Sequence, residues 1–430
     1  MEFILDLHVH SKYSRGTSHS MDLENIYRFA KIKGIQVIAT GDFTHPAWFN
    51  EIRKKLEPAE DGLFKLKNKL AKKQDKTLPA IIKKKSVRFI LSAEISNIYS
   101  KGGKVRKMHN VILAPDFKTV SKINNKLSEI GNLTSDGRPI LGLDSKKLLK
   151  ITVNSNPLTM LIPAHIWTPW FSLFGSKSGF NSIEEAFEEL SSNIYAIETG
   201  LSSDPFMNWR LDQLKNLTIL SNSDAHSPLK MGREANILNC KPTYKNIIKT
   251  IQSNDKRMIG TIEFFPQEGK YHCDGHRKCN VVFTSEQTKK HKGICPKCNK
   301  PLVVGVNYRV GELADEKSNY KPKQHKKVEY IIPLLEILSE LGGFKKPGKK
   351  VMRDYEKLYS VLGDEFSILR KVPIEKIKEA GFEKLAGGIE RMRKGQVHIT
   401  PGFDGVFGII KVFENNTQAQ KYGGQKNLFE

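Results

Sequence analysis

Short apolar runs of strand length recur through the first 240 residues, with helix-like stretches between them. The runs cover residues 3–7, 36–40, 88–93, 110–114, 160–164, 194–197 and 218–223. Residues 21–33 and 182–190 carry apolar side chains at the spacing of an amphipathic helix, and Ser20 is the expected cap of the first. Strands that alternate with helices predict a parallel sheet with α/β architecture over residues 1–240.

Side chains of the kinds that bind metals lie at the ends of these runs. His8 and His10 follow the first run and point to one side of an extended chain, because residues two apart share a face. Other runs lead to the following residues: Asp42, His45, Glu94, His165, Glu198, Asp224 and His226. His109 is the exception, because it precedes its run. An isolated His-x-His pair is usually a surface or core pair, but this repetition predicts one site at the rim of a βα-barrel.

The chemistry of phosphodiester cleavage calls for such a cluster. Imidazole nitrogens and carboxylate oxygens bind divalent cations, and two ions about 3.5–4 Å apart can activate water and stabilise a leaving oxygen. A carboxylate can bridge two ions and offset their charge. We therefore expect Glu94, Asp224 and His226 to take part in catalysis.

Several motifs resemble those of the PHP (polymerase and histidinol phosphatase) superfamily: Asp6-Leu7-His8-Val9-His10, Glu94, His109, Pro163-Ala164-His165 and Ser223-Asp224-Ala225-His226. The resemblance implies a distorted seven-stranded βα-barrel that holds two or three divalent metals (Zn, Mn or Mg) and hydrolyses phosphoesters. It also implies this set of metal ligands: His8, His10, Glu94, His109, His165, Asp224 and His226. In the second motif, residues 41–45, the ligand is open between Asp42 and His45.

Four of the five cysteines cluster after residue 240. Cys273 and Cys279 are separated by five residues, and Cys295 and Cys298 by two, which predicts a closed structural zinc site. Because the first spacing is wide, His272 or His276 could replace one thiolate. Cys240 stands apart and is expected in the core.

The charge of the chain favours a polyanionic partner. The chain has 70 Lys+Arg and 46 Asp+Glu, for a formal net charge of +24, and neutralising phosphates releases counterions. Residues 51–88 are lysine-rich, either as a solvated helical face or as part of a basic surface. Residues 310–413 are basic and helical in pattern, with helices expected over 328–341 and 374–381. The glycines and arginines of 387–395 could hold a phosphate backbone.

An aromatic loop follows His165. Residues 166–180 are too rich in Pro, Gly and Ser for a helix, yet they include Trp167, Trp170, Phe171 and Ser172. The loop either packs under the barrel or forms a pocket in which an extruded base stacks.

The order of these parts, ending in Pro401-Gly402-Phe403-Asp404-Gly405-Val406-Phe407-Gly408, resembles the endonuclease Q family. That resemblance implies a DNA repair enzyme that nicks on the 5′ side of deaminated bases (uracil, hypoxanthine, xanthine) and of abasic sites. Two alternatives are a PHP-type phosphatase of small molecules such as histidinol phosphate, and a non-catalytic nucleic-acid-binding PHP protein. We expect a PHP domain at 1–240, connector and zinc knuckles at 241–308, a basic helical module at 309–413 and a flexible tail at 414–430.

The tail carries a short apolar motif. Gln425, Leu428 and Phe429 resemble the peptide by which repair proteins bind the sliding clamp, although the tail could instead fold back on the helical module. No apolar run approaches 18 residues and the chain starts without a basic leader, so we expect a soluble cytoplasmic, nucleoid-associated protein without a membrane partner.

Overall fold

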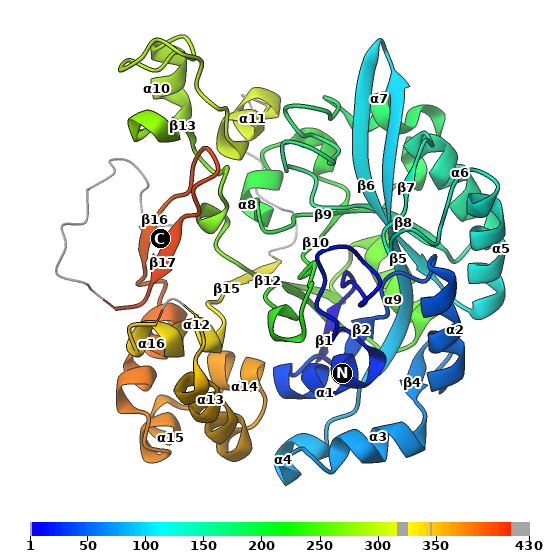
Figure 1. Ribbon diagram of the computed structural model, residues 1–430, viewed down its shortest axis with the longest axis vertical. Coiled ribbons are helices and arrows are strands. Elements are labelled where there is room, and N and C mark those ends of the chain that lie inside the picture. Colours follow the sequence, from blue (N-terminus) through cyan, green and yellow to red (C-terminus); the bar gives the residue numbers. More distant parts are fainter. Residues whose placement is uncertain (1, 316–325, 345, 414–430) are drawn as a thin grey trace.

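The computed structural model describes residues 2–315, 326–344 and 346–413. The tail motif at 425–429 lies outside these residues. In Figure 1 the sheet and its helices occupy the right-hand side, a small cysteine-bearing module around α10 and β13 lies at the upper left, and a helical module (α12–α16) lies at the lower left. The described helices include none with the length and apolar character needed to cross a bilayer.

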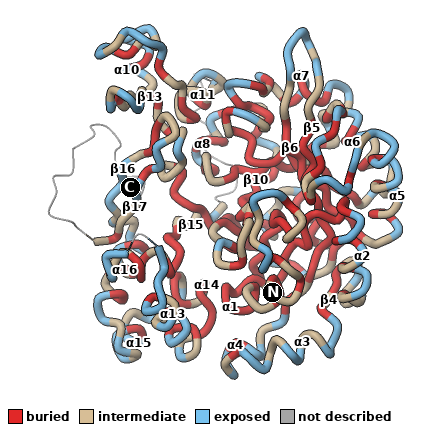
Figure 2. Tube along the Cα trace, viewed as in Figure 1, coloured by how far each residue is buried: buried red, intermediate tan, exposed pale blue. Residues whose placement is uncertain are grey.

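All seven apolar runs of the first 240 residues form strands. They are β1 (Glu2–Asp6), β2 (Val37–Ala39), β5 (Arg88–Lys101), β6 (Lys104–Ala114), β8 (Met160–Pro163), β9 (Ala196–Glu198) and β10 (Thr218–Leu220). The short strands β3 (Leu56–Pro58), β4 (Phe64–Leu66) and β7 (Ile140–Leu141) join the edge of the sheet. Figure 2 shows the buried residues concentrated along these strands, with exposed residues on the surrounding helices and loops.

The sheet is mixed, so the expectation of a purely parallel sheet is wrong. β1, β2 and β5 run parallel, but β5 continues directly into antiparallel β6, which also pairs antiparallel with β8. A turn at Gly102 and Gly103, with φ of 60° and 71°, makes this reversal possible because glycine adopts positive φ readily. His109 lies inside β6, not before it: the polar residues from Lys104 onward extend the strand into solvent as half of a hairpin.

β9 and β10 pair with each other in parallel and connect to the main sheet through a few polar contacts. The Ile166 amide donates to the Glu198 carbonyl over 3.1 Å, and the Leu7 amide donates to the Asn222 side chain over 2.8 Å. The α/β class is confirmed, and a closed seven-stranded barrel stays a prediction.

The sheet extends past the expected domain boundaries at 240 and 308. β1 pairs with β11 (Ala235–Asn239), β11 with β12 (Met258–Glu263), and β12 with β15 (Lys327–Tyr330). The expected helix over 328–341 is therefore wrong in its first part, because residues 327–330 find a strand partner. The helix α12 (Leu334–Leu341) begins only after Pro333, whose ring disfavours helical geometry in the residue before it.

The helices around the sheet are α1 (Leu23–Lys33), α2 (Pro46–Lys55), α3 (Asn68–Asp75), α4 (Ala80–Lys83), α5 (Phe117–Ser128), α6 (Ser145–Ser155), α7 (Ile183–Phe187), α8 (Pro205–Asn208) and α9 (Tyr244–Ser253). Asp22 caps α1, not Ser20, because its carboxylate accepts from the Asn25 amide. α3, in the lysine-rich insertion, has no buried residue and forms a solvated face.

The remaining elements complete the two smaller modules. They are β13 (Asp274–His276), β14 (Val281–Phe283), α10 (Ser285–Lys290), α11 (Val306–Leu313), α13 (Lys349–Leu362), α14 (Glu365–Arg370), α15 (Ile374–Glu379), α16 (Glu383–Arg393), β16 (His398–Thr400) and β17 (Ile409–Lys411). Gly387 and Gly388 lie inside α16, where backbone amides bond within the helix. Arg393 donates to carbonyls of residues 368, 369 and 372. These glycine amides and this arginine therefore support the fold, which contradicts the expectation that they hold phosphate.

Candidate metal centre

A first group of ligand-type side chains forms where β1 ends. Single ligand atoms of His8, His10, Glu94 and Asp224 all lie within 4.8 Å of one another. His10 Nε2 is 3.0 Å from Asp224 Oδ1 and 3.2 Å from Glu94 Oε2. His8 Nε2 is buried without a hydrogen-bond partner among the described residues, although it faces Glu94 and Asp224 at 3.5 and 3.6 Å. An orphaned imidazole nitrogen among carboxylates fits a bound cation.

A second group shares Glu94 with the first. Glu94 Oε1 is 2.9 Å from His109 Nδ1 and 3.1 Å from His165 Nε2, and the two imidazole nitrogens are 3.2 Å apart. One oxygen of this carboxylate therefore faces the β1 histidines, and the other faces the histidines on β6 and after β8. Glu94 can bridge two cations, and its donor set of nitrogen and oxygen atoms suits zinc or manganese.

Two further carboxylates contact the Nδ1 atoms of His8 and His10 and so orient their rings. Asp42 Oδ1 is 3.1 Å from His10 Nδ1, and its other oxygen accepts from Ser11 and Ser14. Glu198 contacts His8 Nδ1 with both oxygens, at 3.0 and 3.1 Å. A carboxylate on the second ring nitrogen fixes the tautomer that presents Nε2 to a metal. The sequence pattern predicted Glu198 at a strand end. Its role in orienting His8 is visible only from the contacts between the two side chains.

Asp42 and His45, the two candidate ligands in the second motif, belong to neither of the two groups of ligand-type side chains. Asp42 acts on His10, as described above. His45 caps α2 by accepting from the Trp48 amide, and its ring stacks on Tyr13 with centroids 4.4 Å apart. His226 lies beside the first group, with its ring centroid 4.5 Å from that of His10 and its Nδ1 2.8 Å from the Asp224 carbonyl, but it belongs to neither group as placed.

Arg138 was not anticipated from the sequence. Its Nη1 lies 3.2 Å from Glu94 Oε2, and its side chain is 25% exposed. It lies 44 residues from Glu94 in the chain, in a loop with no motif to mark it. A guanidinium beside a metal centre is favourable when a phosphate shares the space, because Arg binds phosphate with paired N–H groups.

The backbone is bent sharply at three of these residues. Asp42, His165 and Asp224 have φ of 48°, 29° and 46°, in the left-handed region that side chains other than glycine disfavour. Gly200 lies against His165, where a Cβ would fall 2.3 Å from the His165 Cβ. Such strain gathers at sites that position side chains for function.

Most of the ionisable groups hold one another in charged form, and His109 is the exception. Burial lowers the pKa of His8, but Glu198, Glu94 and Asp224 outweigh it and raise that pKa well above its usual value. Burial acts to raise the pKa of Glu94, yet His109, His8 and Arg138 hold it well below its usual range. For His109 burial dominates and lowers the pKa to about 4. Metal ligands must give up their protons, so cations compete with protons for these positions.

The second cluster of ligand types lies in the upper module. His276, Cys279, Cys295 and Cys298 have ligand atoms within 4.8 Å of one another. Burial opposes ionisation of Cys295, but backbone amides of residues 297 and 298 lower the pKa of its thiol to about 7, which suits a thiolate ligand.

Cys273, predicted as a zinc ligand, lies outside this cluster. Its amide donates to the Gly402 carbonyl over 2.9 Å, and burial raises the pKa of its thiol to about 12. The β13–β14 hairpin explains the difference, because Cys273 precedes β13 while His276 ends it beside Cys279. The side chains that could hold a metal here are thus three cysteines and one histidine, with His276 in the position expected for Cys273.

The aromatic loop lies directly against the candidate metal centre. The ring of Phe171 is 4.8 Å from the ring of His109, and φ at Phe171 is 60°. Trp170 is 43% exposed and meets Tyr271 edge-on. Trp167 is buried and donates to Asn208, and Ser172 is buried with its hydroxyl on the Thr168 carbonyl. Trp170 and Phe171 are thus at least partly open to solvent, whereas Trp167 and Ser172 pack the loop.

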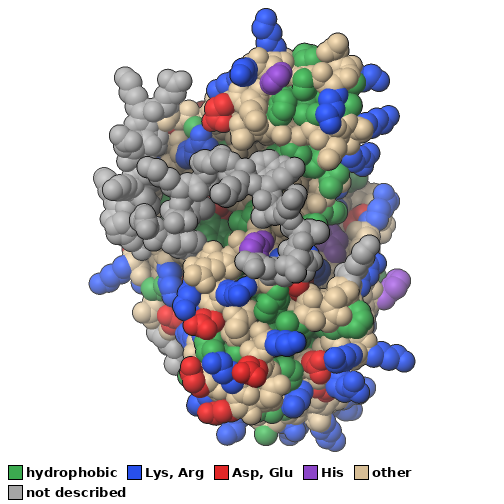
Figure 3. Space-filling model, turned by 90° about the vertical axis from the view of Figure 1, so that its left-hand side faces the viewer, with side chains coloured by type: hydrophobic (Ala, Val, Ile, Leu, Met, Phe, Trp, Pro, Cys, Tyr) green, Lys and Arg blue, Asp and Glu red, His purple; other side chains and the backbone are tan. Residues whose placement is uncertain are grey.

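Basic side chains are spread over the molecule. Figure 3 shows Lys and Arg at both ends of one face, with acidic side chains gathered mainly at the lower end, over the helical module. Such a distribution suits a long polyanion that contacts several parts of the protein.

Three comparisons place the chain among known proteins. The family model of the MJ0043 C-terminal domain matches residues 333–396. An uncharacterized protein, MJ0043 of Methanocaldococcus jannaschii, is 33% identical over 271 residues, which cover 61% of this chain and 33% of that protein. The chain thus spans about a third of the length of that relative.

Two solved structures match almost end to end. One is PfuEndoQ from Pyrococcus furiosus, a lesion-specific endonuclease, with a TM-score of 0.82, 29% identity and coverage of 96% of this chain and 95% of that one. The other is endonuclease Q in complex with a 27-mer duplex that has an abasic lesion at the active site, with a TM-score of 0.81, 30% identity and coverage of 96% and 97%. On this match, the chain belongs to the endonuclease Q family of DNA-cleaving hydrolases.

Proposed function

We propose that this protein is a metal-dependent lesion endonuclease that nicks DNA on the 5′ side of deaminated bases (uracil, hypoxanthine and xanthine) and of abasic sites. The observation that carries the proposal is the placement of Glu94 between two groups of histidines, with one oxygen toward each. Family membership and the net charge of +24 support DNA as the substrate. A repair role of this kind would place the protein in the cytoplasm, at the nucleoid.

Two divalent cations fit the donor atoms present. His8, His10, Glu94 and Asp224 would hold one, and Glu94, His109 and His165 the other. When bound, such a pair supplies an activated water and stabilises the oxygen that leaves. Glu198 and Asp42 keep His8 and His10 in the tautomer that offers Nε2. Arg138 is positioned to hold a phosphate oxygen next to Glu94.

The aromatic loop supports recognition of an extruded base. Phe171 offers an aromatic surface beside the metal ligand His109, and the neighbouring Trp170 is open to solvent. A base leaves the stack most easily when it is mispaired or damaged, and aromatic stacking offsets part of the unstacking cost. Phe171→Ala should therefore slow nicking of a lesion duplex more than hydrolysis of bis-p-nitrophenyl phosphate.

The test is cleavage of duplexes that differ at one position. Uracil, hypoxanthine, xanthine, an abasic site or a normal base is placed in the same sequence, with Mn²⁺ or Zn²⁺ present, and the nick is mapped at nucleotide resolution. We expect a single nick 5′ of each lesion and none in the normal duplex. Equal cleavage of all duplexes, or none, would reject the lesion specificity, and release of phosphate from histidinol phosphate instead would favour the phosphatase alternative.

A further inference from the structure

Exposed apolar side chains gather on the hairpin of residues 398–411, which contains β16 and β17. Among the described residues, Phe407 is the most exposed of the large apolar side chains, at 69%, and three more lie on the same hairpin: Ile399, Val406 and Ile409. The hairpin lies between the cysteine-bearing module and the helical module (Figure 1). Such a concentration of exposed apolar side chains indicates an interaction surface.

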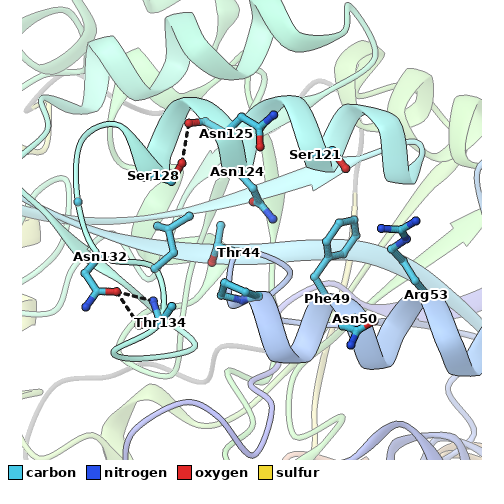
Figure 4. Close-up of a pocket in the computed structure, with 13 residues that line it drawn as sticks. Thr44, Phe49, Asn50, Arg53, Ser121, Asn124, Asn125, Ser128, Asn132 and Thr134 are labelled. Atoms are coloured by element: carbon cyan, nitrogen blue, oxygen red, sulfur yellow. Dashed lines mark hydrogen bonds between the residues drawn. The ribbon is translucent and has the colours of Figure 1, made fainter.

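The groove between α2 and α5 has a different character. It presents mainly Asn, Ser and Thr side chains, and its one aromatic ring, Phe49, is buried (Figure 4). The hairpin, in contrast, presents its ring directly to solvent. A flat, apolar group such as a nucleic-acid base can therefore reach the hairpin ring more readily than the groove ring.

The backbone of the hairpin is held firmly in place. Phe403 and Val406 exchange two main-chain hydrogen bonds, of 3.0 and 2.8 Å, around a turn in which Asp404 and Gly405 have φ of 41° and 83°. Positive φ at both central residues is typical of a type I′ turn, for which Asp-Gly is a favoured pair. The amides of residues 402, 408 and 405 also donate to the carbonyls of residues 267, 268 and 270, at 2.8, 3.0 and 2.9 Å. Because Phe407 stands on a fixed backbone, little conformational freedom is lost when its ring binds a partner.

A row of rings and one cation connects Phe407 to the aromatic loop beside the candidate metal centre. The amine of Lys270 is 5.8 Å from the centroid of the Phe407 ring and 5.5 Å from that of the Tyr271 ring. The Tyr271 ring is in turn 6.2 Å from the ring of Trp170, in the aromatic loop. Phe407 therefore lies within about five base-pair steps of Trp170, at about 3.4 Å a step.

Cations flank the exposed ring. Lys270 is exposed, and so is Arg277, whose Nη1 would be 3.7 Å from a Cβ at Gly405. The carboxylate of the turn, Asp404, accepts from the Arg277 amide over 2.6 Å. Exposed aromatic rings combined with Lys and Arg are the features that bind unpaired bases and their phosphates. This charge favours DNA over an apolar protein partner.

Extrusion of a base leaves a gap in the duplex, and that gap needs a partner of its own. The base swings out about its backbone by about 180°, so the gap and the pocket that receives the base are separate places. Phe407 and Phe171 are separate in the same way, with Trp170 and Tyr271 between them. An apolar side chain that enters a base step offsets part of the cost of unstacking.

We propose that Phe407 is a wedge residue, which enters the base stack of the bound duplex and fills the gap left by the extruded lesion. Lys270 holds a phosphate next to that gap. The choice of a duplex with an extruded base rests on the proposed function.

The experiment compares two duplexes of the same sequence. In one, uracil is paired opposite guanine; in the other, uracil lies in a short bubble of unpaired bases. Binding is measured by fluorescence anisotropy, and nicking is measured under single-turnover conditions. A wedge stabilises the extruded state, so its removal should matter when the lesion must leave a stack and should matter little when the lesion is already unpaired.

Phe407→Ala should weaken binding and slow nicking of the paired duplex by about tenfold, which is about 1.4 kcal/mol and within the range of base–aromatic stacking. On the bubble the loss should stay below about twofold, because unstacking is already complete. Phe407→Trp should retain the wild-type preference, since it keeps a ring. Phe344→Ala, which removes a half-exposed phenylalanine from the helical module, is the control and should leave the ratio of the two substrates unchanged. Phe407 is exposed, so its variants should fold.

Lys270→Gln tests the phosphate contact. It should weaken binding of both duplexes equally and reduce the slope of log affinity against log salt by about one, as expected for one lost phosphate contact. Lys249→Gln, on α9, removes an exposed charge elsewhere and should leave the slope unchanged. An unchanged slope in Lys270→Gln would overturn the assigned phosphate contact.

The outcomes separate the wedge from other roles of the hairpin and from the proposed function. Equal losses on both duplexes in Phe407→Ala, or no loss on either, would overturn the wedge and leave lesion nicking by the wild type standing. A wild-type dimer in sedimentation that Phe407→Ala dissociates, with DNA binding unchanged, would assign the surface to a second copy of the chain and also overturn the wedge. Binding of the paired duplex that depends on Phe407, without nicking by the wild type, would overturn the proposed function and support the wedge.

Discussion

Replacement of Glu198 by glutamine tests how the metal centre is held. Glu198 is buried and its two oxygens make four contacts: both reach His8 Nδ1, one accepts from the His165 amide at 2.9 Å and the other from Asn222 Nδ2 at 2.8 Å. Glutamine has nearly the same shape but must place an NH₂ group at one of these oxygen positions. Either choice sets a donor against a donor, because each oxygen faces an N–H group.

The size of the effect follows from that mismatch. A buried polar group left without its partner costs about 1–3 kcal/mol, and about 1.4 kcal/mol corresponds to a factor of ten. Loss of a residue that orients a metal-bound histidine typically weakens metal binding by about 10–100-fold, which is the same range. We therefore expect Glu198→Gln to weaken binding of the metal held by His8 and His10 by one to two orders of magnitude.

The assay is calorimetric titration of the chelator-stripped protein with Mn²⁺, together with nicking of an abasic duplex over a range of Mn²⁺ concentrations. Activity should recover partly at high metal concentration, because the ligands themselves remain. Glu365→Gln is the matched control: Glu365 is equally buried and accepts from Tyr355 and the Leu334 amide in the helical module, so it should affect stability and not metal affinity. Metal affinity of Glu198→Gln within twofold of the wild type, in a folded protein, would refute the role of Glu198.

Three further changes test other parts of the molecule. His276→Ala should remove one equivalent of zinc, measured by plasma mass spectrometry, whereas Cys273→Ser should keep it; the opposite pattern would restore the four-cysteine site. Burial raises the pKa of Glu263 to about 8, so the folded protein retains a proton that the unfolded chain releases near pH 4, and stability should fall as pH rises from about 4 to about 8. The melting temperature of Glu263→Gln minus that of the wild type should accordingly increase between pH 6 and pH 9. A difference that stays constant over this range would contradict the raised pKa of Glu263. Arg138→Met should slow nicking at least tenfold with unchanged metal content, and a loss of bound metal would show that Arg138 only organises the ligands.

Local patterns predicted the strands and brought together most of the side chains expected to bind metal, whose role as ligands stays a prediction. His8, His10, Glu94, His165 and Asp224 all meet at one centre, because each follows a run of apolar residues that forms a buried strand. The signal is local: an apolar run and then a ligand-type side chain, although Glu94 lies inside β5 because that strand continues to Lys101. It needs no knowledge of the partner strands.

Features that depend on distant partners were missed. Arg138 reaches Glu94 from a loop without any local motif, and only the fold brings the two together. Cys273 and His276 are equally plausible by spacing, and the turn of the β13–β14 hairpin decides between them. Residues 328–330 were assigned to a helix because their pattern runs into α12, yet the edge of β12 makes them part of the strand β15.

The pairing of β15 with β12 makes the sequence boundaries poor places to divide the protein. β15, which leads into the helical module, is attached to the main sheet by main-chain pairing with β12, from Gly260–Lys327 to Glu263–Tyr330, as well as by the chain itself. A fragment that stops at residue 308 would keep β12 and lose its neighbour, leaving a row of unpaired amides and carbonyls that invites association with other chains. The sheet that carries the candidate metal centre and the helical module are thus joined by strand pairing and not by a linker alone.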